Sequence, residues 1–133
     1  MFKSLSKFLT KAVYAPVIIA QGRYVKKVTP KLPEAAGERS GTTGRGQKIR
    51  LLIVGDSAAA GVGVDNQSQA LIGNLVATLA NNYQVDWLLL AKSGHTTLDS
   101  LQMLSEQPQQ TFDIIVTSLG VNDVTGSLSA STW

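Results

Sequence analysis

The sequence contains no cysteine and only one histidine, His95, among its 133 residues. The absence of cysteine excludes a disulfide framework, a thiolate metal site and a cysteine nucleophile. A single histidine also argues against a metal centre that is built from several imidazole ligands. The chemistry of this chain must therefore come from other side chains.

No apolar run comes near the roughly 20 residues that a membrane-spanning helix needs. The longest run, residues 12–20, has nine residues and contains Pro16. Before it, residues 2–14 show helical periodicity, with apolar side chains on one side and three lysines on another. We expect residues 1–28 to be a basic amphipathic or hydrophobic segment that lies at a membrane surface. A signal sequence, or a helix that packs on its own domain, are the alternatives.

Acidic residues are scarce in the first 50 positions. This part of the chain has eleven Lys and Arg but only two acidic residues, Glu34 and Glu38, and its net charge is +9. Residues 51–133 reverse the balance, with Lys92 against seven Asp and Glu, a net charge of −6. A basic leader suggests an anionic membrane surface as a partner. We therefore favour a membrane-associated or exported protein over a plainly cytoplasmic one. The acidic body does not suggest a nucleic-acid partner.

The length of the chain allows one domain, or part of one. Residues 29–48 contain prolines and glycines without apolar periodicity, and this composition predicts a flexible linker. The linker would join the leader to a domain over residues 49–133.

Strand and helix patterns alternate from residue 49 onward. Apolar runs predict strands over 49–54, 85–90 and 113–119, and helical periodicity predicts helices over 66–79 and 97–106. This order implies an α/β fold with a parallel sheet and helices outside it. Reactive groups in such a fold lie at the carboxyl ends of the strands.

Three residues that suit acyl transfer follow these strands: Ser57, Gly94 and Asn122. A serine can act as a nucleophile, and a glycine N–H and an asparagine amide can donate to an oxyanion. The plainer alternatives are an N-cap serine, a turn glycine and a loop asparagine. Asp123 is expected to orient its loop rather than to react. Phosphate-binding motifs are absent around Gly61, which counts against a nucleotide site.

The order Gly55-Asp56-Ser57, then Gly94, then Gly120-x-Asn122-Asp123 resembles the SGNH hydrolase superfamily of GDSL esterases and lipases. The resemblance covers roughly residues 49–125, with Ala58 at the usual leucine position. It implies a flavodoxin-like three-layer α/β/α sandwich and hydrolysis of esters, including lipid and acetyl-sugar esters, without a cofactor. It also implies that Ser57 is the nucleophile. The oxyanion hole would consist of the backbone N–H groups of Ser57 and Gly94 and the side-chain amide of Asn122.

The Asp-x-x-His motif that supplies the base in this superfamily is not found in residues 1–133, and His95 belongs to no matching motif. We therefore expect an incomplete domain from a truncated or frame-shifted gene, nearly inactive as this chain. One alternative is a catalytically dead module that binds a ligand while docked at a membrane. A second alternative is a flavodoxin-like protein that binds a mononucleotide.

Overall fold

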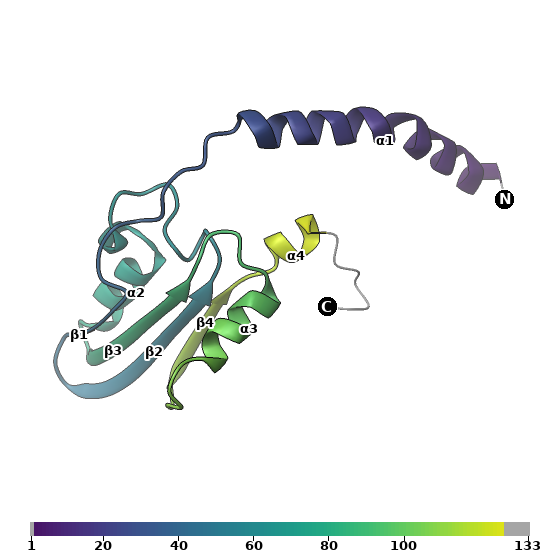
Figure 1. Ribbon diagram of the computed structural model, residues 1–133. Coiled ribbons are helices and arrows are strands. Elements are labelled where there is room, and N and C mark those ends of the chain that lie inside the picture. Colours follow the sequence, from purple (N-terminus) through teal and green to yellow (C-terminus); the bar gives the residue numbers. More distant parts are fainter. Residues whose placement is uncertain (1, 127–133) are drawn as a thin grey trace. The chain divides into compact units, whose positions relative to one another are not determined.

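A computed structural model describes residues 2–126 of the chain, which divides into two compact units, residues 1–31 and 32–133. Figure 1 shows the helices and strands along the chain. In order they are α1 (Phe2–Val28), β1 (Ser40–Thr43), β2 (Gln47–Gly55), the 3₁₀ turn η1 (Gln67–Gln69), α2 (Leu71–Leu79), β3 (Tyr83–Ala91), α3 (Thr97–Ser105), β4 (Ile114–Ser118) and α4 (Val121–Thr125).

The first unit is essentially the helix α1, which continues through Pro16 without a break. The expected N-terminal helix is present, and it extends beyond residues 2–14, where the periodicity was found. Val17, Ile18 and Ile19 are each more than half exposed. Within the described residues, no helix has both the length and the apolar content to cross a bilayer.

The second unit is an α/β fold around a four-stranded sheet with the order β1-β3-β2-β4. The strands β3, β2 and β4 are parallel, as expected, whereas β1 pairs with β3 in the antiparallel direction. The prediction of a purely parallel sheet is therefore wrong, and the sheet is mixed.

The strand β1 lies within residues 29–48, where we expected a linker without regular structure. Its sequence of serine, glycine and threonine carries no apolar pattern, so the strand forms through backbone pairing with the free edge of β3. Gly41 lies opposite Trp87, and a Cβ at Gly41 would come within 3.0 Å of the indole ring. This close approach explains why a glycine suits that position, and the linker interpretation is corrected here.

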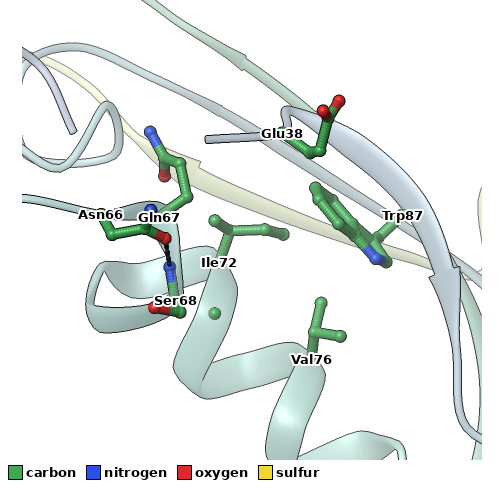
Figure 2. Close-up of a pocket in the computed structure, with 8 residues that line it drawn as sticks. Glu38, Asn66, Gln67, Ser68, Ile72, Val76 and Trp87 are labelled. Carbon is green, nitrogen blue, oxygen red and sulfur yellow. Dashed lines mark hydrogen bonds between the residues drawn. The ribbon is translucent and has the colours of Figure 1, made fainter. Parts of the chain in front are cut away.

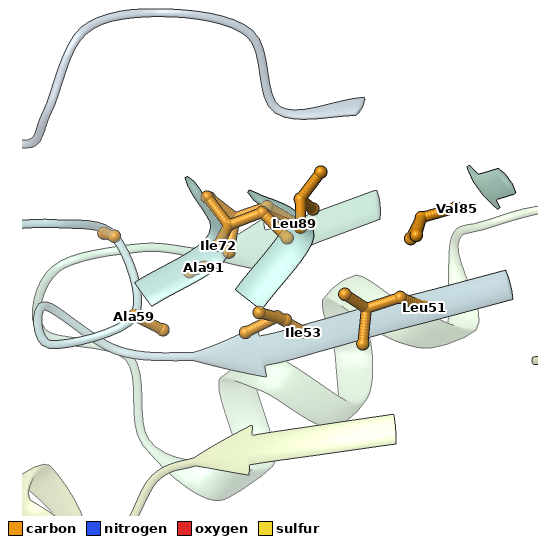
Figure 3. Packing of buried hydrophobic residues seen from close by; sticks show 9 residues of the cluster. Leu51, Ile53, Ala59, Ile72, Val85, Leu89 and Ala91 are labelled. Carbon is orange, nitrogen blue, oxygen red and sulfur yellow. The ribbon is translucent and has the colours of Figure 1, made fainter. Parts of the chain in front are cut away.

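The core forms on both faces of β2, because successive side chains of a strand point to opposite sides. Leu51 and Ile53 pack with α2 on one face (Figure 3), and Leu52 and Val54 pack with α3 on the other. Helices α2 and α3 therefore cover opposite faces of the sheet, as Figure 1 also shows. The burial is uneven: the last five residues of β2 are buried, while no residue of β4 is.

Across the sheet the parallel strands lie in the order β3, β2, β4. The first of them along the chain, β2, therefore lies between the other two. In such sheets the order reverses beside the first strand, and a crevice opens at the carboxyl ends of the strands on either side of that point. Here those strands are β2 and β4. By this rule we expect the reactive groups between the segments that follow Gly55 and Ser118.

Candidate active site

Each of the three candidate residues lies just beyond the carboxyl end of a parallel strand. Ser57 begins a turn two residues after β2, Gly94 lies in the turn after β3, and Asn122 lies in the first turn of α4 after β4. Because the strands are neighbours in the sheet, the three segments emerge at the same edge. This placement agrees with the sequence prediction.

The side-chain amide of Asn122 joins the other two segments. Its Nδ2 donates to the carbonyl of His95 at 2.9 Å and contacts Oδ2 of Asp56 at 3.4 Å. His95 directly follows Gly94, and Asp56 directly precedes Ser57. The amide therefore lies between the Ser57 loop and the Gly94 turn, within reach of both.

Asp56 is a site residue to which the sequence analysis gave no role of its own. It is 4% exposed, and its Oδ1 accepts a hydrogen bond from the N–H of Ala58 at 3.1 Å. Its own N–H donates to the carbonyl of Ser118 at 3.0 Å. The carboxylate thus shapes the turn that carries Ser57, and its place in the Gly-Asp-Ser run was the signal that could have identified it.

Asp123 orients its loop, as the sequence predicts. It is 2% exposed and accepts hydrogen bonds from Thr97, from the N–H at 3.1 Å and from the hydroxyl at 3.0 Å. These bonds tie α4 to the first turn of α3. That turn also has a capping box, in which the hydroxyl and N–H of Thr96 bond to Asp99 and lower the pKa of its carboxyl.

Gly94 adopts a backbone conformation that favours glycine, with φ at +86°. A Cβ built on it would meet nothing within 4 Å, and the residue is exposed. A bound group can therefore approach this peptide closely. Such access is one condition for a backbone donor to an oxyanion.

Ser57 is half-buried at the start of a turn that continues to Gly63. Its carbonyl accepts from the N–H of Val62 at 3.0 Å. The alternative of an N-cap serine is wrong, because no helix begins at this position; the next helical residues are those of η1.

His95 contributes its backbone rather than its ring to the arrangement around Asn122. The ring atom Nδ1 is buried and, among the described residues, has no hydrogen-bond partner. The described residues also contain no cluster of three or more His, Cys, Asp or Glu that could hold a metal ion.

A pocket of about 300 Å³ lies between α2 and β3, as Figure 2 shows. Ile72 and Val76 of α2 and the indole of Trp87 give it a largely apolar lining. None of the three candidate residues lines it. The pocket is thus separate from the strand-end site.

These features define an α/β protein with a serine, a glycine and an asparagine at adjoining strand ends. The model of the GDSL-like lipase/acylhydrolase family matches residues 53–133, which is more than half of the chain, and the chain belongs to this family. The resemblance to the SGNH hydrolases that the motifs predict is thereby confirmed. No curated protein matches the chain.

Proposed function

We propose that this protein is a serine hydrolase that cleaves ester bonds through Ser57. The hydroxyl oxygen attacks the acyl carbon, and its proton leaves to a base. The tetrahedral oxyanion accepts hydrogen bonds from the N–H of Ser57, the N–H of Gly94 and Nδ2 of Asn122. For this, Nδ2 keeps its bond to His95 and exchanges its longer contact with Asp56, at 3.4 Å, for the oxyanion. Collapse breaks the ester bond, and the alcohol leaves with a proton. Water then releases the acyl group as a carboxylic acid and restores the serine.

The observation that carries this proposal is the position of the Asn122 amide, which contacts the neighbours of both Ser57 and Gly94. Membership of an acylhydrolase family supports the same reaction class. We also infer that the fold is of the flavodoxin-like α/β/α type. The order of the parallel strands and the placement of α2 and α3 on opposite faces support this inference.

We expect weak activity from this chain alone, because residues 1–133 contain no Asp-x-x-His motif. In serine hydrolases the nucleophile and its histidine act as a unit, and loss of either costs on the order of 10⁶ in kcat. Binding and the oxyanion hole still leave roughly 10³–10⁴ over the reaction in water. Added imidazole can act as the missing base, and this offers a direct test.

The test compares hydrolysis of p-nitrophenyl acetate by the wild type and by Ser57→Ala, with and without imidazole. We expect an imidazole-dependent rate that is lost in Ser57→Ala and falls about 10²-fold or more in Asn122→Ala. The Ser57→Ala variant also corrects for hydrolysis by imidazole itself. Equal rates in the wild type and Ser57→Ala would contradict the proposal and favour a module that only binds its ligand.

We further infer that α1 attaches the protein to an anionic membrane surface. Residues 1–31 carry seven Lys and Arg and no acidic residue, and Val17, Ile18 and Ile19 are exposed beside them. Basic residues near an anionic bilayer contribute about 1 kcal/mol each, and apolar side chains add to the binding. The substrate would then be an ester in or near a membrane.

A further inference from the structure

A short segment outside the family match, residues 34–39, contacts both the Gly94 turn and the Ser57 loop. It precedes the matched region, which begins at residue 53, and falls where the sequence predicts a linker. Neither the motifs nor the proposed reaction assigns it a role. Its contacts nevertheless converge on the segments that carry the oxyanion donors.

An ion pair within this segment binds the residues that lead into Gly94. Oε1 of Glu34 accepts from the N–H of Ser93 at 2.6 Å, and its Oε2 pairs with Nη2 of Arg39 at 2.6 Å. Nη1 of Arg39 in turn donates to the carbonyl of Ala91, the last residue of β3. The ion pair therefore binds the backbone at Ser93 and Ala91, one and three residues before Gly94.

The same segment is fixed to the loop that follows Ser57. The N–H of Ala35 donates to the carbonyl of Ala60 at 3.2 Å. The side-chain amide of Gln67, a residue only 4% exposed, donates to the carbonyls of both Ala35 and Ala60. The segment is thus bonded to the Ser57 loop through Ala35 and to the Gly94 turn through Glu34.

We propose that Glu34 and Arg39 are positioning residues that hold the Gly94 peptide in register with Ser57, an inference that rests on the proposed hydrolase function. The turn needs such support because Lys92, Ser93 and Gly94 are all exposed. A Cβ at Gly94 would also meet no neighbouring atom, so side-chain packing does not fix the turn. An oxyanion donor must be held closely, since a misplacement of about 1 Å can cost 10²-fold in rate.

The test measures phosphonylation of Ser57 by a fluorophosphonate probe in the presence of imidazole, in the intact chain. The variants are Glu34→Ala, Glu34→Gln and, as a matched control, Glu38→Ala, which removes an exposed carboxylate from the same segment. We expect the rate constant of labelling to fall about tenfold in Glu34→Ala, with complete labelling at long times. Glu34→Gln should be intermediate, because its amide oxygen can still accept from Ser93. Glu38→Ala should match the wild type.

Amide hydrogen exchange in the same variants gives a readout that does not depend on reactivity. In Glu34→Ala the N–H of Ser93 should exchange about tenfold faster, while the amides of Leu52 and Ile53 keep their protection. Faster exchange throughout β2, or a lower final extent of labelling instead of a lower rate, would show a general loss of stability and overturn the positioning role.

The outcomes separate the two proposals. If the wild type is labelled and Glu34→Ala reacts as fast as Glu38→Ala, the positioning role is overturned and the hydrolase proposal stands. If the wild type is not labelled at Ser57 at all, the hydrolase proposal fails and the positioning role falls with it.

Discussion

Two almost fully buried carboxylates, Asp56 and Asp123, hold the site together through hydrogen bonds to other parts of the chain. Asp56 contacts Asn122, and Asp123 accepts from Thr97. A buried carboxylate is costly unless it is hydrogen-bonded. Here each carboxylate has a partner in the first turn of a helix that is distant in the sequence, Asn122 of α4 for Asp56 and Thr97 of α3 for Asp123. These bonds therefore couple the stability of the fold to the arrangement of the site.

Asp123 gives a direct test of this coupling. In Asp123→Ala the N–H and hydroxyl of Thr97 lose their acceptor, and we expect the free energy of unfolding to fall by about 1–3 kcal/mol. Asp123→Asn keeps one acceptor oxygen and should lose less. Urea unfolding of both variants measures the difference. Equal losses, or none, would show that the bonds to Thr97 do not stabilise the junction of α3 and α4.

Glu34 makes the stability of the fold depend on pH. The pKa of its carboxyl is held below the ordinary value of 4.5, chiefly by the N–H of Ser93 and further by the Arg39 guanidinium. A lowered pKa in the folded state means that the carboxylate stabilises the protein fully above pH 4.5, and that this contribution is lost as the pH falls through the lowered pKa.

The Tm difference between the wild type and Glu34→Gln should therefore be largest near pH 6 and should shrink below pH 4.5. Thermal unfolding monitored by circular dichroism from pH 7 to pH 3 measures it, with Glu38→Gln as the control. A difference that stays constant over this range would mean that ionisation of Glu34 contributes nothing.

At the residue scale, the sequence predicted the strand-end positions of Ser57, Gly94 and Asn122, because each directly follows a recognisable strand. It could not predict the roles of Glu34 and Arg39. Their partners beside Gly94 are backbone atoms more than 50 residues away, and such contacts leave no trace in a residue pattern.

The turn after β2 contains two glycines with positive φ that differ in their surroundings. Gly61 has φ at +78°, and a Cβ there would lie 2.7 Å from Cβ of Ala35 and 2.8 Å from Cβ of Ala70. Gly63 has φ at +104° and nothing within 4 Å. Alanine substitutions at these two glycines therefore distinguish the cost of backbone strain alone, at Gly63, from strain combined with overpacking, at Gly61.

We expect Gly63→Ala to cost about 1–2 kcal/mol, the usual strain of a left-handed alanine. Gly61→Ala should cost about 1–3 kcal/mol more, because its methyl group overfills a packed contact. Chemical denaturation of the two variants provides the comparison. Similar losses would mean that Ala35 and Ala70 can move aside.

At the scale of elements, hydrophobic periodicity predicted three strands and two helices to within a few residues at most boundaries. The helix expected from residue 66 begins instead as the 3₁₀ turn η1, and α2 starts at Leu71. The strand β1 escaped prediction because it carries no apolar pattern and is held chiefly by backbone pairing with β3. An unbroken helix through Pro16 was likewise not predicted, since proline usually interrupts a helix.

The two compact units of the whole molecule should be separable. Deletion of residues 1–31 removes α1 but no residue of the sheet or of the candidate site. We expect the Tm of residues 32–133 to change by less than about 4 °C, the shift that corresponds to roughly 1 kcal/mol. The deletion should abolish co-sedimentation with vesicles of phosphatidylcholine and phosphatidylserine.

Binding of the intact chain to these vesicles should weaken as salt is added, because ions screen the attraction between basic residues and the anionic surface. Vesicles of phosphatidylcholine alone are the control. Vesicle binding that does not weaken with added salt, or that remains after deletion of residues 1–31, would contradict an electrostatic contribution from α1.

The uneven burial of the sheet has a consequence for inactivation by heat. Ser57 follows β2, which is paired on both sides and enclosed on both faces, whereas Asn122 follows the exposed border strand β4. On warming, the edge strand β4 and the Asn122 that follows it should become mobile while β2, which precedes Ser57, remains folded. Catalytic competence should thus disappear at a lower temperature than the one at which the protein melts.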